Sequence, residues 1–131
     1  VASTGANVLD DYEEGTWTPA DGTAAALAIT VNGATYVKLG QMVFAGCDIT
    51  YPVTADTSGA QLTGLPFAAQ TAAGPGNGSI GYNTSATAHL WRVLANTTGA
   101  AAVTTTAGTA VTNAQLSAAT LALMFTYRAA A

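Results

Sequence analysis

The chain has 131 residues, a net charge of −4 and only three basic residues. This length fits one domain, and so few cations exclude the basic face that nucleic acid or an anionic membrane surface requires. Only 8% of the residues are charged, against about 25% in ordinary soluble proteins. A monomer with so few charges is poorly protected against association, and we therefore expect an oligomer whose identical copies share a buried surface.

Cysteine usage and hydropathy exclude further classes of protein. Cys47 is the single cysteine, so neither an intrachain disulfide nor a cysteine-rich metal site is expected. Membrane insertion is not expected either, because no apolar run reaches the length of about 18 residues that a spanning helix needs. The chain begins at Val1 rather than at methionine, and we expect a fragment, a processed product or the ordered part of a longer protein.

Residues 1–14 are predicted to form an entry segment or linker before a single domain over residues 15–131. The stretch VLDDYEE (8–14) is predicted to form a turn or a short helix, and it holds more than half of the chain's seven acidic residues, Asp10, Asp11, Glu13 and Glu14. Calcium could bind such a cluster, but the spacing does not match an EF-hand loop. We expect the acids instead to favour a helix dipole or to keep a sheet edge from pairing with other chains.

Residues 26–39 carry the clearest local signal. Asn32-Gly33 lies between two alternating runs and predicts a two-residue hairpin loop, because both residue types tolerate positive φ. Such a loop pairs Val31 with Ala34 and Ile29 with Tyr36.

The longest strand is predicted over residues 41–51. Its inner face is predicted to line a sandwich and to bury an inert Cys47; this face carries Val43, Ala45, Cys47, Ile49 and Tyr51. The other face carries Met42 and Phe44 before Asp48 and Thr50, so only half of it is apolar. We expect a neighbouring subunit to cover that half.

Shorter strands follow, separated by turn residues. They are predicted over residues 60–65, 79–82, 88–95 and 100–106, with an exposed loop at 70–78 and one helical turn within 114–119. A last strand over 120–128 places Leu121, Leu123, Phe125 and Tyr127 on one face. The pattern predicts an all-β domain, an antiparallel β-sandwich of about eight strands.

Catalytic equipment is scarce in this sequence. His89 is the only histidine, and no GxSxG elbow surrounds any serine that it could activate. Outside the N-terminal cluster, the remaining acids that could pair for glycoside hydrolysis are Asp21, Asp48 and Asp56. We expect no enzyme, no catalytic or metal-binding residue and no cofactor.

Sugar binding is the chemistry for which the sequence offers candidates. A sugar site combines an aromatic ring with amides and hydroxyls, and loops on a rigid scaffold are the usual place for it. The predicted ligand-binding residues are Tyr82, Asn83, Ser85, Trp91 as a stacking platform and Asn96 as an amide partner. Trp91 has a second interpretation as a core or interface residue. Trp17 is expected to anchor the entry strand.

Several segments, taken in order, resemble the C-terminal domains of bacteriophage tail fibres and tailspikes. They are LDDYEEGTWTP (9–19), TYVKLG (35–40), QMVFAGCDITYP (41–52), TADTSGAQLTGLPF (54–67), GYNTSA (81–86) and TNAQLSAATLALMFTYR (112–128). The resemblance covers nearly the whole chain. It implies a jelly-roll-like β-sandwich at the tip of a homotrimeric fibre.

The same resemblance implies a viral protein on the virion, in a tail fibre or another exposed appendage. Its expected partners are identical copies in a homotrimer, a polysaccharide or protein of the host surface, and other virion proteins. The family has no catalytic motif to transfer, and its receptor-contacting residues vary. The alternative is a purely structural virion protein, a trimerisation or head-decoration module without a ligand.

Overall fold

The computed structural model describes residues 11–71 and 76–130, which form one antiparallel sheet of nine strands. The all-β prediction is confirmed. Within the described residues the one helical element is a short 3-10 turn, η1 (Ala114–Leu116), inside the predicted range. The strands are β1 (Tyr12–Thr16), β2 (Ala20–Asp21), β3 (Thr30–Leu39), β4 (Met42–Thr50), β5 (Gln61–Thr63), β6 (Gly76–Asn83), β7 (His89–Val93), β8 (Ala100–Thr104) and β9 (Thr120–Arg128).

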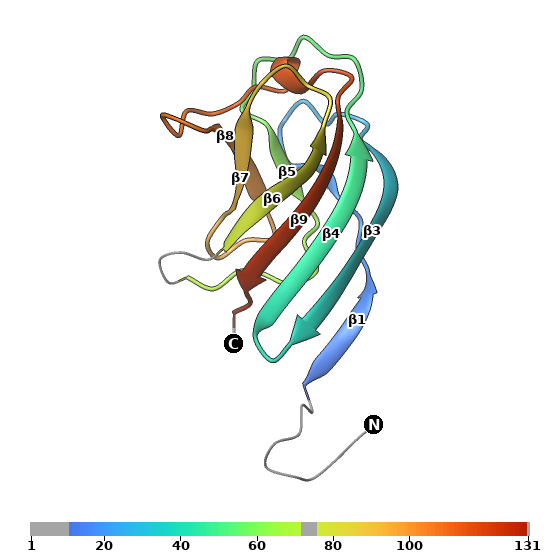
Figure 1. The fold of residues 1–131 in the computed structure, drawn as a ribbon, viewed down its shortest axis with the longest axis vertical. Coiled ribbons are helices and arrows are strands. Elements are labelled where there is room, and N and C mark those ends of the chain that lie inside the picture. Colours follow the sequence, from blue (N-terminus) through green and yellow to red (C-terminus); the bar gives the residue numbers. More distant parts are fainter. Residues whose placement is uncertain (1–10, 72–75, 131) are drawn as a thin grey trace.

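The sheet curls back on itself. Its strand order is β1-β3-β4-β9-β6-β7-β8-β5-β2, and Figure 1 shows the long strands β3, β4, β9 and β6 in front, with β8 and β5 behind them. Only residues 17–19 separate the end of β1 from the start of β2. An extended chain of that length spans about 14 Å, so the two edge strands approach each other closely.

The core lies between the front and back halves of the curled sheet. β4 and β9 pair along their whole length, and their inward residues are buried as predicted, Cys47 among them. Alternate residues of a strand point to opposite faces, which explains why the period-two pattern of 120–128 gave both the bounds of β9 and its inner face.

Three aromatic rings meet at the centre of the core. Phe125 makes edge-to-face contacts with Trp17 and with Trp91, each at 6.2 Å between ring centroids. Gly78 lies beside them, and a Cβ there would come within 2.7 Å of the Phe125 ring. The Trp17 indole N–H donates to the carbonyls of Thr35 (3.2 Å) and Gly46 (3.1 Å). Trp17 is thus the predicted anchor of the entry strand.

The predicted hairpin at Asn32-Gly33 is wrong. β3 continues through both residues, and its pairing with β4 shifts by one residue there, as in a β-bulge. Val31 and Ala34 therefore pair with β4 rather than with each other. The chain reverses instead at Gly40, whose φ is 59°; glycine at the first of two central positions is what a type II′ turn uses.

Two other boundaries differ from the prediction. The strand β1 pairs with β3, so residues 12–14 belong to the sheet rather than to a linker or helix. The predicted loop at 70–78 ends earlier, because β6 begins at Gly76 and pairs with β9; residues 72–75 lie outside the described residues. The strands β5, β7 and β8 fall within their predicted ranges.

Candidate functional site

The structure does not bring all the predicted sugar-binding residues together. Asn83 ends β6 and Ser85 follows it in the loop to β7, whereas Asn96 comes after the other end of β7. Since β7 has five residues, it separates these positions by about 16 Å. Asn96 also uses its backbone N–H on the carbonyls of Ala69 and Gln70. The expectation that Asn96 joins residues 82–85 in one site is wrong.

Trp91 is not a stacking platform. Its side chain is 1% exposed and packs against Phe125 inside the core, so its second interpretation, as a core residue, is correct. Tyr82 is 59% exposed, but it lies in β6 opposite Ala122 of β9 rather than in a loop. Its ring is therefore part of the sheet's outward surface.

The polar side chains of the loop after β6 form hydrogen bonds within the loop itself. The Asn83 carboxamide accepts from the Ser85 N–H at 2.8 Å and donates to the Thr87 carbonyl at 3.3 Å. The Ser85 hydroxyl donates to the same carbonyl at 3.2 Å. These bonds hold the loop, and a ligand at Asn83 or Ser85 would have to compete with them.

His89 is buried beside Trp91, with the two rings 6.1 Å apart. Its Nδ1 lies 2.9 Å from the Thr87 carbonyl. A carbonyl only accepts, so Nδ1 donates to it, while the buried Nε2 has no hydrogen-bond partner among the described residues. Within residues 11–71 and 76–130, no group of three His, Cys, Asp or Glu side chains could hold a metal ion.

The side-chain amide of Asn113, which was not predicted from the sequence, connects three loops by hydrogen bonds. Asn113 is fully buried, and its amide donates to Asp56 at 2.8 Å and to Thr23 at 3.2 Å. Asp56 also accepts from the Ser58 N–H, and these hydrogen bonds, that of Asn113 first, lower the pKa of Asp56. The sequence Asp-Thr-Ser at 56–58 predicts an Asx turn. No local pattern predicts that Asn113 hydrogen-bonds to Asp56.

The acidic cluster divides between the two faces of β1. Glu13 accepts from the Tyr36 hydroxyl at 2.6 Å, while Glu14 accepts from Tyr12. Neighbouring residues of a strand point to opposite faces, so Glu13 and Glu14 do not converge on one cation. The helix-dipole role is wrong for residues in a strand. Edge protection fits, because β1 is the edge of the sheet; Asp10 lies outside the described residues.

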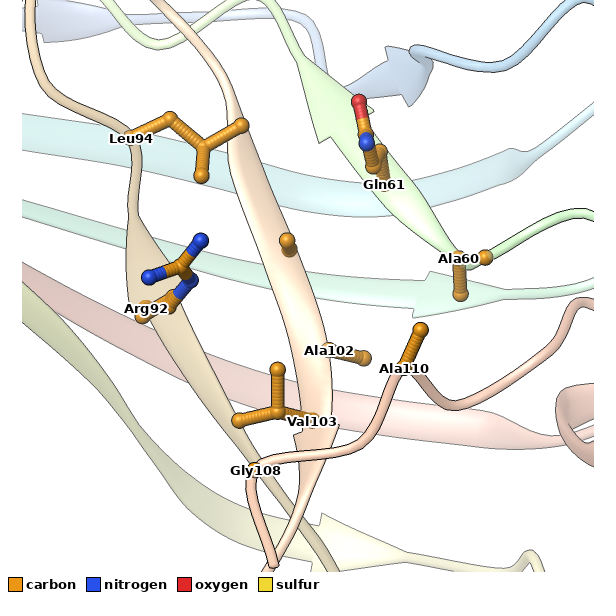
Figure 2. Close-up of a pocket in the computed structure, with 10 residues that line it drawn as sticks. Ala60, Gln61, Arg92, Leu94, Ala102, Val103, Gly108 and Ala110 are labelled. Atoms are coloured by element: carbon orange, nitrogen blue, oxygen red, sulfur yellow. The ribbon is translucent and has the colours of Figure 1, made fainter.

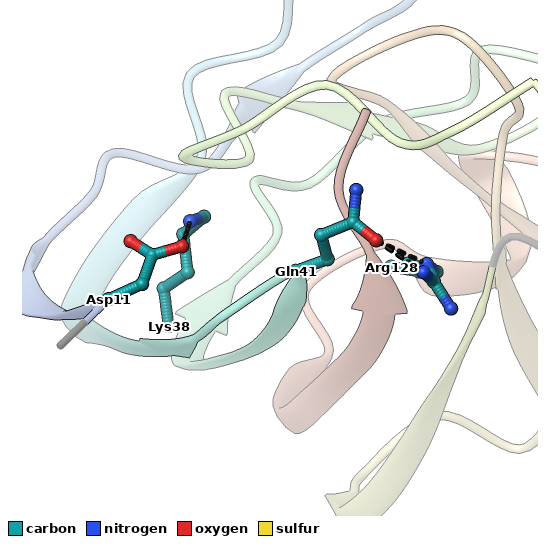
Figure 3. A network of polar contacts seen from close by, with 4 residues as sticks. All are labelled: Asp11, Lys38, Gln41 and Arg128. Carbon is teal, nitrogen blue, oxygen red and sulfur yellow. Dashed lines mark hydrogen bonds and ion pairs between the residues drawn. The ribbon is translucent and has the colours of Figure 1, made fainter. Parts of the chain in front are cut away.

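Two of the chain's three basic residues have partners within the domain (Figure 3). Lys38 on β3 pairs with Asp11, which directly precedes the edge strand β1, at 3.4 Å. The Arg128 guanidinium donates to the side-chain oxygen of Gln41 at 2.8 Å. Arg92, the third, lies on the outward side of β7, and no carboxylate of the described residues lies within salt-bridge distance of it.

The outward surface of the front strands exposes large apolar side chains. Met42 and Phe44 on β4 are 39% and 37% exposed, and Met124 on β9 is 45% exposed. Met124 lies over Gly46, where a Cβ would meet its terminal methyl at 3.0 Å. We define the outer apolar face by Tyr12, Val37, Leu39, Met42, Phe44, Tyr82 and Met124. The predicted apolar half of β4 is confirmed as exposed in the single chain.

The outward surface of the back strands is different, because it is hollowed. A hollow of about 360 Å³ lies over β7, β8 and β5, between Arg92 and Gln61 (Figure 2). Its floor and rim are made largely of alanine and glycine, including Ala101 and Gly108. We refer to it as the Arg92 hollow. None of its residues was predicted from the sequence to form a site.

Comparison with known proteins found no matching family model, no matching curated protein and no matching solved structure. The resemblance to phage tail fibres therefore stays a prediction that rests on the quoted segments. No helix of the described residues is long and apolar enough to cross a membrane.

Proposed function

We propose that this chain is the C-terminal domain of a phage tail fibre, which assembles as a homotrimer through its outer apolar face and attaches the virion to the host surface. The observation that supports the assembly is the exposure of Met42, Phe44 and Met124 on two adjacent central strands. The tail-fibre identity and the host attachment rest on the sequence resemblance. The facing halves of the curled sheet suit the sandwich that the resemblance implies.

Burial of these side chains supplies a driving force for assembly. Burying a whole Met or Phe side chain is worth about 1.5–3 kcal/mol. Met42, Phe44 and Met124 each keep roughly two fifths of that exposure, so covering all three contributes about 2–4 kcal/mol per subunit. Tyr12 and Tyr82 extend the contact at its two flanks.

The charges around the outer apolar face permit contact between copies. Glu14 lies on β1 at one flank, and Arg128 lies on β9 on the other side of β3 and β4. The strands between them carry Val37, Leu39, Met42 and Phe44 on this face. Copies that meet there bury apolar surface between one acidic and one basic flank.

The test is the mass of the protein in solution, measured by light scattering at micromolar concentration. We expect a trimer for the wild type and a smaller species for Phe44→Glu, because a carboxylate would be buried in the contact. Val53→Glu is the matched control, since Val53 is 85% exposed and lies outside the outer apolar face. A monomeric wild type would overturn the assembly, and so would equal loss of the trimer in both variants.

The second candidate is a structural virion module without a ligand. The observations in its favour are the buried ring of Trp91 and the internal hydrogen bonds of Asn83 and Ser85. A glycan array on the trimer separates the two candidates. Specific glycan binding supports the attachment function, whereas no binding to any glycan together with an intact trimer supports the structural module.

A further inference from the structure

The Arg92 hollow combines a cation, an amide and empty space in one cross-strand row. Arg92 of β7 pairs with Ala101 of β8, and Ala101 pairs with Gln61 of β5. On its other side Arg92 pairs with Asn77 of β6. Arg92 and Gln61 thus stand two strand spacings apart, about 10 Å, with only the Ala101 methyl group between them.

Small residues keep the space above Ala101 open. Gly59, Gly108 and Ala110 line the hollow where larger side chains would fill it. Figure 2 shows Arg92 and Gln61 on opposite sides of the hollow, and Leu94 and Val103 at its margin. A volume of about 360 Å³ lies in the range of small-molecule sites.

We propose that the Arg92 hollow binds a carboxylate-bearing sugar unit, such as the uronic acid of an acidic polysaccharide. A guanidinium matches a carboxylate with two parallel hydrogen bonds. The amide of Gln61 suits a hydroxyl group of a sugar, and Leu94 and Val103 suit its C–H groups. This inference rests on the proposed host attachment and names the class of glycan that the domain binds.

Arg92 is distinguished from the other two cations by its surroundings. Lys38 is paired with Asp11 and lies over the Phe67 ring, and Arg128 donates to Gln41. The chain carries a net charge of −4, so an anion gains attraction only near a cation whose charge is not neutralised by a carboxylate. Asp11 neutralises Lys38, whereas Gln41 is a neutral amide and leaves the charge of Arg128 in place. Of the two remaining cations, Arg92 is the one that lines the hollow.

The hollow lies apart from the proposed assembly contact. It is formed by β7, β8 and β5, whereas the outer apolar face lies chiefly on β1, β3, β4 and β9. A trimer joined through the outer apolar face leaves the hollow accessible on each copy. Binding and assembly can therefore be lost separately, which makes the two proposals distinguishable.

The test is a titration of the full chain with glucuronate, galacturonate and N-acetylneuraminate, followed by NMR. We expect saturable binding of at least one acid with a Kd on the order of 1 mM, and shifts at the amides of residues 92 and 101. Glucose and galactose, which lack the carboxylate, should bind at least about tenfold more weakly. Binding of none of the three acids would overturn the inference, and so would equal binding of inorganic phosphate.

Variants locate the site. Arg92→Ala should weaken binding of the acid at least tenfold, whereas Arg128→Ala removes the same charge elsewhere and should leave it unchanged. Equal losses in both variants would contradict a site at Arg92. Adsorption of the wild type to host cells tests the proposed attachment itself. If cells bind the wild type and Arg92→Ala equally well, host attachment stands and the acidic-sugar site falls.

Discussion

The two halves of one curled sheet present different outward surfaces. The front half exposes Met42, Phe44 and Met124 on adjacent long strands, while the back half exposes Leu90 on β7 and carries alanine and glycine around Arg92. Large apolar side chains gain free energy by being covered, and small ones leave room for a ligand. The same core thus supports a surface suited to assembly and a surface suited to recognition.

The largest effect is expected where the two halves join. Gly78→Ala should lower the free energy of unfolding by about 3 kcal/mol, since overpacking a dense core costs about 1–3 kcal/mol or more. Its Cβ would lie 2.7 Å from the Phe125 ring and 2.9 Å from the Trp91 Cβ. Urea denaturation measures the loss.

Gly81→Ala is the matched control for that change. It lies on the same strand, and its Cβ would approach nothing nearer than the Ala122 carbonyl at 3.8 Å. Similar losses at Gly78 and Gly81 would contradict the close packing of β6 on the aromatic centre.

Tyr82 lies at the β6 flank of the outer apolar face, so a substitution there should affect subunit association and not sugar binding. Tyr82→Ala should weaken subunit association about tenfold, or about 1.4 kcal/mol, because an exposed ring would no longer be covered. Acidic-sugar binding should be unchanged, because β6 pairs with β7, the strand that carries Arg92, through Asn77 and Gly78 and not through Tyr82. Sedimentation equilibrium and the sugar titration measure the two effects. Lost sugar binding with intact association would return Tyr82 to the binding site.

A smaller effect is expected from the loops that the Asn113 amide ties together. Its hydrogen bond lowers the pKa of Asp56 below the ordinary value of 3.8. The ionised carboxylate therefore stabilises the fold above about pH 4, and this contribution is lost as the pH falls through the lowered pKa. Thermal unfolding between pH 2 and 5 should show a shallower acid decline for Asp56→Asn than for the wild type. An unchanged decline would contradict this role.

The smallest effect is expected at Cys47, which lies in the core beneath the front half. Burial raises the pKa of its thiol to about 12, and the thiolate is the reactive form. A thiol reagent at pH 8 should label the native protein far more slowly than the urea-unfolded protein. Rapid native labelling would show that the front half opens readily.

The sequence predicted the elements whose pattern is regular along the chain. In β9 the large residues Leu121, Leu123, Phe125 and Tyr127 alternate with residues that are smaller or more polar except for Met124, and both the bounds and the inner face were correct. The Asn-Gly signal failed because it is local. Nine of the ten residues of β3 pair with β4, and in that long ladder Asn32 and Gly33 form part of a bulge rather than a turn.

Sites were harder to predict than strands. His89, Trp91 and Val93 alternate inward along β7, a pattern that could have placed Trp91 in the core and Arg92 on the surface. The Arg92 hollow could not be found in this way, because Gln61, Arg92 and Ala101 meet only through the pairing of three strands. Strand order is set by the whole chain, so such a site becomes visible only in the fold.

The central claim is that the outer apolar face is covered in the assembled protein, and the chain carries its own reporters there. Its two methionines are Met42 and Met124, and both lie on that face. Mild peroxide oxidation followed by mass spectrometry measures how accessible they are. We expect slow oxidation of both in the wild-type assembly and fast oxidation in Phe44→Glu. Equally fast oxidation of both methionines in the intact wild-type assembly would contradict it.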